Sequence, residues 1–275
     1  MKSVLAKTQD GTITLTITIP VAQIKKAREE ELQRVTNDAT LPGFRKGKAP
    51  KEIVEKNVDK AKLQEDILRR LLPTAYTEAV TEHKLKPVIN PKIHVTKLED
   101  DKDWEFTATT CETPEVTLKN YKDAVKKITA KSKIVVPGKE NPGPSMDDII
   151  KTVLENVTVV IPQILLDGEV ERLLAQLLDE IKSLGLSLDQ YLGSTHKTIE
   201  NLKKEQEVRA SQDITFEFAL AKIAEEEKIT VDQKEIDEAL GKAKDDAERK
   251  NLESNVYLLA SILRQQKTLD YLKNL

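Results

Sequence analysis

Leu41-Pro42-Gly43-Phe44-Arg45-Lys46-Gly47-Lys48-Ala49-Pro50 is the stretch from which the organisation of this 275-residue chain can be worked out. Two prolines enclose two glycines, so the segment is predicted to be a turn-rich loop between regular elements. It places three cations beside Phe44, an aromatic residue that either docks onto a partner or folds back into the core. The sequence therefore predicts a docking loop, with a solvated basic turn as the alternative.

A nucleotide-binding P-loop is the first chemical class to test against this stretch. That motif has four residues between its glycines and a Ser or Thr after its lysine. Here only Phe44, Arg45 and Lys46 separate the glycines, and Ala49 follows Lys48, so no hydroxyl is present for Mg²⁺. What remains is the docking chemistry of arginine and lysine, which bind carboxylate or phosphate groups, next to an apolar ring.

The segments on either side of the loop predict an α+β domain over residues 1–113. Residues 12–19 alternate strictly between threonine and aliphatic side chains, which is typical of a half-buried strand. Asp10-Gly11 predicts a hairpin turn that pairs this strand with residues 3–8. Helices are predicted over residues 20–39, 51–57 and 60–83, and a second hairpin over residues 92–97 and 104–112.

The pattern Gly43-Phe44-Arg45-x-Gly47-Lys48-x-Pro50, placed between two helices, resembles the signature loop of trigger factor, a family of bacterial ribosome-associated chaperones. The resemblance implies that Gly43, Phe44, Arg45, Lys46, Gly47 and Lys48 bind the large ribosomal subunit at the tunnel exit. The implied partners are a ribosomal protein and nearby rRNA. Ala49 departs from the branched aliphatic residue that the family usually has there. The whole of residues 1–113 resembles the ribosome-binding domain of the family.

Residues 114–145 are predicted to form an extended linker. Between Ala130 and Met146 the sequence has three prolines and two glycines. The trigger factor family normally carries an FKBP-like prolyl isomerase domain at this place, and a linker of this size cannot contain a domain. We therefore expect that the isomerase domain is absent and that the chain is not an enzyme.

Residues 146–275 are predicted to be an all-α domain. Helical periodicity covers residues 147–157, 162–185, 198–227 and 251–272, and capping-box patterns begin at Ser187 and Thr230. Glu169-x-x-Arg172-Leu173-Leu174 and Ile223-Ala224-x-Glu226 resemble the trigger factor C-terminal domain, whose helical pattern also occurs in the periplasmic chaperone SurA.

Some apolar residues of this helical part fall outside the main buried stripes and are predicted to bind clients. They are Phe216, Leu220, Tyr257, Leu258 and Ile262. Lys222 and Arg264 lie between them and are expected to keep the surface soluble. The alternative is that these side chains fill the helical core or a dimer contact. A homodimer therefore remains open.

Composition excludes several other function classes. Lys and Arg total 44 against 47 Asp and Glu, so any RNA contact must be local. Cys111 is the single cysteine, and His83, His94 and His196 lack metal-ligand spacing, so we predict no metal, cofactor or catalytic residue. The sequence begins without a signal-peptide pattern and has no run long enough to span a membrane. A cytoplasmic protein without a membrane partner is expected.

The function that these features favour is an ATP-independent chaperone that docks at the ribosome and holds nascent or unfolded polypeptides without isomerase activity. The alternative is a helical adaptor that binds an acidic protein or an RNA surface through the basic loop and has no client. An isomerase would require a catalytic pocket that the sequence does not reveal.

Overall fold

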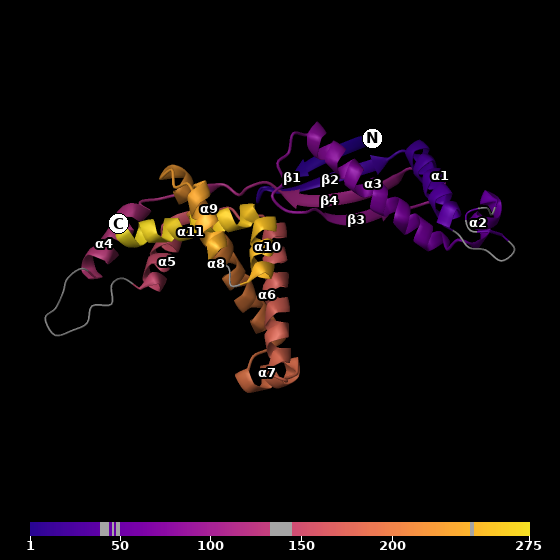
Figure 1. Cartoon of the computed structure of the whole chain (residues 1–275). Coiled ribbons are helices and arrows are strands. Elements are labelled where there is room, and N and C mark those ends of the chain that lie inside the picture. Colours follow the sequence, from indigo (N-terminus) through magenta and orange to yellow (C-terminus); the bar gives the residue numbers. More distant parts are fainter. Residues whose placement is uncertain (39–43, 46, 48–49, 133–144, 243–244) are drawn as a thin grey trace. The chain divides into compact units, whose positions relative to one another are not determined.

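The computed structural model describes the chain except for residues 39–43, 46, 48–49, 133–144 and 243–244. The chain divides into two compact units, Met1–Thr113 and Pro114–Leu275 (Figure 1). Each unit has a hydrophobic core of its own. The first has the bounds predicted for the N-terminal domain, whereas the second begins well before position 146.

The first unit is built on an antiparallel sheet in the order β1-β2-β4-β3. Its strands are β1 (Lys2–Lys7), β2 (Thr12–Ile19), β3 (Lys92–Lys97) and β4 (Trp104–Cys111). The alternation of β2 buries its four aliphatic residues completely, and their partners on β4 include Phe106 opposite Ile17. Because side chains alternate across a strand, the threonines of β2 face the other side of the sheet.

Three helices complete this unit: α1 (Val21–Asp38), α2 (Lys51–Asn57) and α3 (Lys60–Glu82). Helix α3 runs along the sheet (Figure 1) and buries Leu63, Ile67, Ala75 and Ala79. Pro73 lies inside α3, and its ring is exposed. Its leucines at 68, 71 and 72 are half-buried against the same core.

The second unit is helical apart from one pair of short antiparallel strands, β5 with β6. Its elements are β5 (Val116–Leu118), α4 (Tyr121–Ser132), α5 (Met146–Glu155), β6 (Val157–Val159), α6 (Gln163–Ser183), α7 (Leu188–Thr195), α8 (Ile199–Glu226), α9 (Gln233–Gly241), α10 (Asp246–Ser254) and α11 (Val256–Asn274). Helices α6 and α8 pack side by side, and α7 lies at the end of this hairpin (Figure 1).

The prediction of an extended linker over residues 114–145 is wrong for its first part. Residues 116–118 pair with β6, and α4 places Tyr121 and Val125 in the core of the second unit. The proline- and glycine-rich composition that motivated the prediction belongs to residues 133–144, which lie outside the described residues.

Two further details of the helical unit differ from the sequence prediction. The helix expected over residues 251–272 is two helices, because Asn255 has φ −123° and ψ 39° between α10 and α11. Its side chain donates to the backbone carbonyl of Asn251, a local bond that competes with helix continuation. The predicted capping box at Ser187 is present, whereas the one predicted at Thr230 begins at Asp232.

Candidate functional site

The predicted docking loop lies between the end of α1 and the start of α2, so its position depends on how these helices pack. Arg28 of α1 forms an ion pair with Glu55 of α2, with 3.2 Å between Nη2 and Oε1. Val54 of α2 is 1% exposed. Both ends of the loop are thus attached to the folded first unit.

Gly47 is the loop position at which the backbone requires glycine. Its φ is +73°, and a Cβ atom added there would lie 2.7 Å from the carbonyl oxygen of Asn37 in α1. A side chain would therefore be strained by the backbone angle and would also clash with the last turns of the helix. Gly47 allows the loop to return close to α1.

The side chains predicted to dock are exposed where the structure describes them. Phe44 keeps 38% of its surface exposed and Arg45 is exposed as well. The alternative in which Phe44 is buried in the core does not fit this exposure. Gly43, Lys46 and Lys48 lie outside the described residues.

The predicted client surface of the second unit is only partly exposed. Tyr257, Leu258 and Ile262 of α11 are 95%, 62% and 51% exposed. Phe216 is partly buried against the core, and the expectation that Leu220 is exposed is wrong because it is 3% exposed. Helix α8 packs against α5, α11 and the β5–β6 pair, so it buries more than one stripe.

Exposed apolar residues also gather near α7, where the sequence prediction placed none. Leu184 and Ile199 are 73% and 63% exposed, and Leu186 is exposed too. Gly185 has φ +72° and ends α6 between the two leucines. The sequence feature that could have predicted this exposure is a pair of leucines on either side of a glycine that ends a helix. Residues beyond the end of a helix are not part of its buried stripe.

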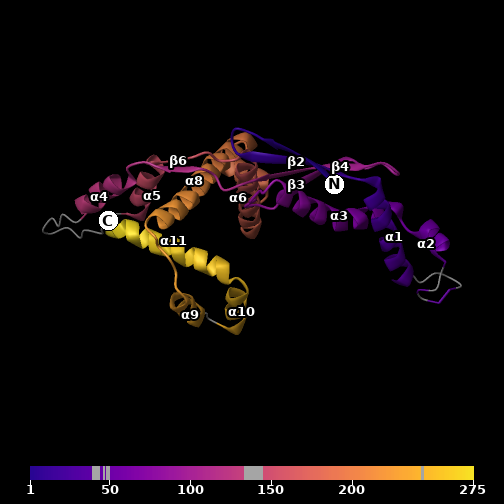
Figure 2. The ribbon, with the colours of Figure 1, turned by 90° about the horizontal axis from the view of Figure 1, so that it is seen from above.

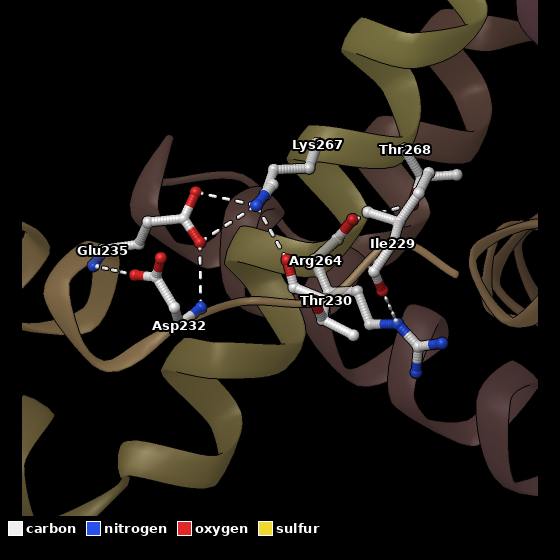
Figure 3. A network of polar contacts seen from close by, with 7 residues as sticks. All are labelled: Ile229, Thr230, Asp232, Glu235, Arg264, Lys267 and Thr268. Carbon is white, nitrogen blue, oxygen red and sulfur yellow. Dashed lines mark hydrogen bonds and ion pairs between the residues drawn. The ribbon is translucent and has the colours of Figure 1, made fainter. Parts of the chain in front are cut away.

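A polar network fixes α9 and its preceding turn against α11 (Figure 3). Lys267 Nζ donates to Glu235 Oε1 at 2.7 Å and to the carbonyl oxygen of Thr230 at 2.7 Å. Arg264 Nε donates to the carbonyl oxygen of Ile229 at 3.0 Å. Arg264 is therefore half-buried and holds the backbone of a turn, in addition to carrying charge between the exposed apolar residues.

The same Glu235 carboxylate belongs to the capping box of α9. It accepts from the backbone N–H of Asp232, while Asp232 accepts from the backbone N–H of Glu235. The bond from Lys267 and the backbone bond at Asp232 hold the pKa of Glu235 below its usual range. The turn that leads away from α8 is thereby positioned relative to α11. Figure 2 shows α8, α9 and α11 seen from above.

A second carboxylate, Glu227, joins three elements of the helical unit. It accepts hydrogen bonds from Tyr121 Oη of α4 at 3.3 Å and from Tyr271 Oη of α11 at 2.7 Å. Lys122 Nζ lies 2.6 Å from Glu227 Oε1. The bond from Lys122 is the largest cause that lowers the pKa of Glu227, followed by the bond from Tyr271. Burial raises the pKa of Tyr121, and the charge of Glu227 raises it further.

The remaining titratable side chains form no reactive cluster in the part of the chain that the structure describes. No group of three or more His, Cys, Asp or Glu side chains there is placed to hold a metal ion. Cys111 is buried, and burial raises the pKa of its thiol, which disfavours the nucleophilic thiolate. His83 contacts Ser3 Oγ, whereas His94 and His196 are exposed.

Family models match both units of the chain. The family model of the bacterial trigger factor protein matches residues 1–139, and that of the trigger factor C-terminus matches residues 146–275. The chain belongs to the trigger factor family. Together the two matches include both units and leave only residues 140–145 between them.

Individual trigger factors are similar over part of the chain. Those of Staphylococcus aureus strains JH9 and Newman are each 42% identical over 108 residues, which is 39% of this chain but 25% of the relative. A solved structure from work on promiscuous substrate recognition by the trigger factor chaperone is 13% identical, with a TM-score of 0.65. That match covers 100% of this chain and 99% of the other, and it shows that the trigger factor fold is shared.

Among the described helices, none combines the length and the apolar character that a membrane crossing requires.

Proposed function

We propose that this trigger factor family member is an ATP-independent chaperone that docks at the exit of the ribosomal tunnel and holds nascent or unfolded polypeptides. The observation that carries the proposal is the loop next to Gly47, which presents Phe44 and Arg45 at the surface while both of its ends are attached to packed helices. Membership of the family supports the same assignment.

The loop has the side chains that an interface with a ribosomal protein and rRNA requires. Arginine binds carboxylate or phosphate through two parallel hydrogen bonds, and an exposed ring adds apolar area at the centre of a contact. The proposed contact residues are Gly43, Phe44, Arg45, Lys46, Gly47 and Lys48. Because the chain has a net charge of −3, the attraction to RNA is local to this loop and should weaken as salt is added.

Co-sedimentation with purified ribosomes tests the docking step. The combined substitution Phe44→Ala, Arg45→Ala and Lys46→Ala should abolish co-sedimentation and leave the circular dichroism spectrum unchanged. A matched control replaces an exposed aliphatic residue, a lysine and an arginine elsewhere in the first unit: Val88→Ala, Lys86→Ala and Arg69→Ala. Undiminished binding by the loop variant would refute ribosome docking through this loop.

Client holding is proposed for the second unit, at the exposed apolar side chains of α11. An unfolded chain presents scattered apolar groups, so its binder needs exposed apolar area that is not narrowly shaped. Tyr257, Leu258 and Ile262 provide such area. Leu220 is buried and contributes to the core, and Phe216 contributes only the part of its ring that remains exposed.

Suppression of aggregation by the full chain tests this proposal. A denatured protein diluted into buffer should scatter less light with the wild-type chain than with a variant carrying Tyr257→Gln, Leu258→Gln and Ile262→Gln. The control places Val4→Gln, Val88→Gln and Ile93→Gln on exposed positions of the first unit. If both variants suppress aggregation as well as the wild type, the client surface lies elsewhere. If the wild type has no effect, the adaptor function is favoured.

We further propose that the chain lacks isomerase activity and works in the cytoplasm. The residues left between the two family matches, 140–145, are far fewer than the roughly 50 residues of a small domain. A peptide with a prolyl bond should therefore isomerise at the uncatalysed rate, over tens of seconds or longer at room temperature. Faster exchange at stoichiometric protein would contradict this part of the proposal.

A further inference from the structure

Strand β1 has backbone hydrogen-bonding groups that find no partner in the part of the chain that the structure describes. The sheet order makes β1 and β3 the two edges, and β1 pairs with β2 alone (Figure 1). The backbone N–H of Thr8 donates to the carbonyl oxygen of Thr12 at 2.9 Å, and this pair continues the register of β1 with β2. Because hydrogen-bonded pairs alternate along an antiparallel ladder, every second residue of β1 bonds to β2 and the others point their backbone groups away from it. The outward-pointing residues are Ser3, Leu5 and Lys7.

The two edges of the sheet differ in regularity. Strand β1 pairs with β2 without interruption along its whole length, whereas the register of β3 shifts between Val95 and Lys97. Such an irregularity twists an edge and hinders the addition of a further strand. The side chain of Ser3 also donates to Glu82 Oε2 at 2.6 Å, which holds β1 against the end of α3. Strand β1 is therefore the edge that can accept another strand.

The chemistry of this edge favours an extended chain that carries a carboxylate. A row of outward N–H and C=O groups is complementary to the backbone of a further strand. In the centre of β1, Val4 and Leu5 are 66% and 37% exposed, and they lie on opposite faces of the sheet. Within the described residues, the exposed Lys2 forms no ion pair, whereas Lys7 Nζ lies 3.5 Å from Glu112 Oε2. Lys2 is thus the cation that is available to a bound strand.

A second copy of β1 would be a poorer partner than such a chain. Antiparallel pairing over the whole strand would place Lys2 of one copy opposite Lys7 of the other, at both ends of the pair. Like charges that lie directly opposite each other on neighbouring strands are destabilising. The lysines therefore disfavour self-pairing and favour a strand with an acidic residue opposite Lys2.

We propose that β1 binds an extended peptide segment as an added antiparallel strand, with apolar residues opposite Val4 and Leu5 and an acidic residue opposite Lys2. The backbone groups of Ser3, Leu5 and Lys7 form the hydrogen bonds to this segment. The site uses neither the docking loop nor α11, so the proposal does not depend on ribosome docking or on client holding.

NMR titration of the isotope-labelled full chain with the peptide acetyl-Thr-Thr-Ile-Val-Thr-Glu-amide tests the proposal. In the proposed register the isoleucine of the peptide lies opposite Leu5, its valine opposite Val4 and its glutamate opposite Lys2. The backbone amide signals of Ser3, Leu5 and Lys7 should shift and saturate at roughly millimolar peptide, because a few exposed hydrogen bonds only slightly exceed the cost of association. A peptide with lysine in place of the glutamate should bind about fivefold more weakly.

Methylation of single peptide amides distinguishes strand pairing from general apolar contact. The N–H of the isoleucine points toward β1, because this residue lies opposite Leu5, so an N-methyl group there should weaken binding by about tenfold. The N–H of the valine, opposite Val4, points away from β1. An N-methyl group on the valine adds the same apolar volume and should change binding by less than about twofold.

Variants of the chain test the same edge from the other side. Leu5→Pro removes an outward N–H and keeps the bonds to β2, as prolines do on edge strands, and should weaken binding by about tenfold. Val4→Gln keeps every backbone group and should weaken it by no more than about threefold. Lys2→Glu should reverse the preference between the glutamate and lysine peptides, whereas Lys62→Glu, at an exposed position of α3, should keep it. The proposal is overturned if the amides of β1 show no saturable shift, if the two methylated peptides bind equally, or if folded Lys2→Glu retains the wild-type preference.

Discussion

The ammonium group of Lys267 lies 2.7 Å from Glu235 Oε1 and thereby joins α11 to the capping box of α9. The same ammonium group donates to the carbonyl oxygen of Thr230, so one lysine holds both the turn before α9 and the first turn of that helix. This relationship matters for the exposed apolar surface, because α9 packs on the helix that carries Tyr257, Leu258 and Ile262.

Replacing Glu235 with glutamine should loosen α9 without unfolding the unit. Glutamine still accepts the capping-box bond from the backbone of Asp232 but cannot form the ion pair with Lys267. Backbone amides of α9 should then exchange with deuterium faster, while those in the core half of α11 keep their protection. Glu238→Gln, an exposed position on the same helix, serves as the control. Equal exchange in the wild type and Glu235→Gln would show that capping alone holds α9.

The Glu227 carboxylate should make the free energy of unfolding of the helical unit depend on pH. Its pKa is lowered in the folded chain from the ordinary value of 4.5 by Lys122 and Tyr271. A carboxylate whose folded pKa is depressed contributes stability that is complete above its unfolded pKa and is lost as the pH falls through the folded value. The contribution should therefore be constant above about pH 5 and should disappear at lower pH.

Urea unfolding of the wild type and of Glu227→Gln over this pH range tests the assignment. The difference in free energy of unfolding between the two should be largest near neutral pH and should shrink below about pH 4.5. Glu226→Gln, the exposed neighbour, should follow the wild type throughout. A difference that is independent of pH would show that Glu227 acts through packing and not through its charge.

The first unit was predicted well from the sequence because its signals are local. The alternation of residues in β2 predicts a strand, and the turn at Asp10-Gly11 predicts its hairpin, each from a few neighbouring residues. The structure gives β2 the predicted bounds of Thr12–Ile19. The second unit depends more on tertiary contacts. Helix α4 belongs to it in part because Tyr121 donates to Glu227, 106 positions away, a carboxylate that also accepts from Tyr271. No local sequence pattern indicates such a contact.

The exposure of the candidate client-binding residues also depends on tertiary contacts that the sequence pattern does not predict. Both Leu220 and Leu258 fall outside the main apolar stripe of their helices, yet one is 3% exposed and the other 62% exposed. The difference is set by tertiary packing: Leu220 belongs to the core cluster that α8 forms with α4, α5 and α11, whereas Leu258 lies outside that cluster. Periodicity identifies a surplus of apolar residues on a helix but does not tell which of them another helix covers.

Gly47→Ala and Gly168→Ala should have opposite effects. Alanine at position 47 requires a left-handed backbone, which costs about 1–2 kcal/mol, and its Cβ would meet the Asn37 carbonyl oxygen at 2.7 Å. The loop should move, and ribosome co-sedimentation should fall while the core of the first unit stays folded. Alanine at position 168 in α6 meets nothing within 4 Å and should stabilise the second unit by about 0.5–1 kcal/mol. Unchanged ribosome binding by Gly47→Ala would show that docking does not need this loop conformation.

Helix α4 should be required for the stability of the second unit, although it precedes the residues that the sequence assigned to the C-terminal domain. Tyr121 is 3% exposed and Val125 is fully buried, next to Ile149 and Val153 of α5. Each buried side chain of this kind contributes about 1.5–3 kcal/mol, so the loss of both is comparable to the total stability of a marginal domain.

A fragment of residues 114–275 should therefore unfold cooperatively at higher urea than a fragment of residues 146–275, which leaves part of the core uncovered. In the full chain, Val125→Ala should lower the free energy of unfolding of the second unit by about 2 kcal/mol, because it opens a cavity in a packed core. Val208→Ala removes the same methyl groups from a position that is 60% exposed and should change that free energy by less than about 0.5 kcal/mol. If the two fragments unfold at the same urea concentration, α4 contributes no stability, and Val125→Ala should then be as mild as Val208→Ala.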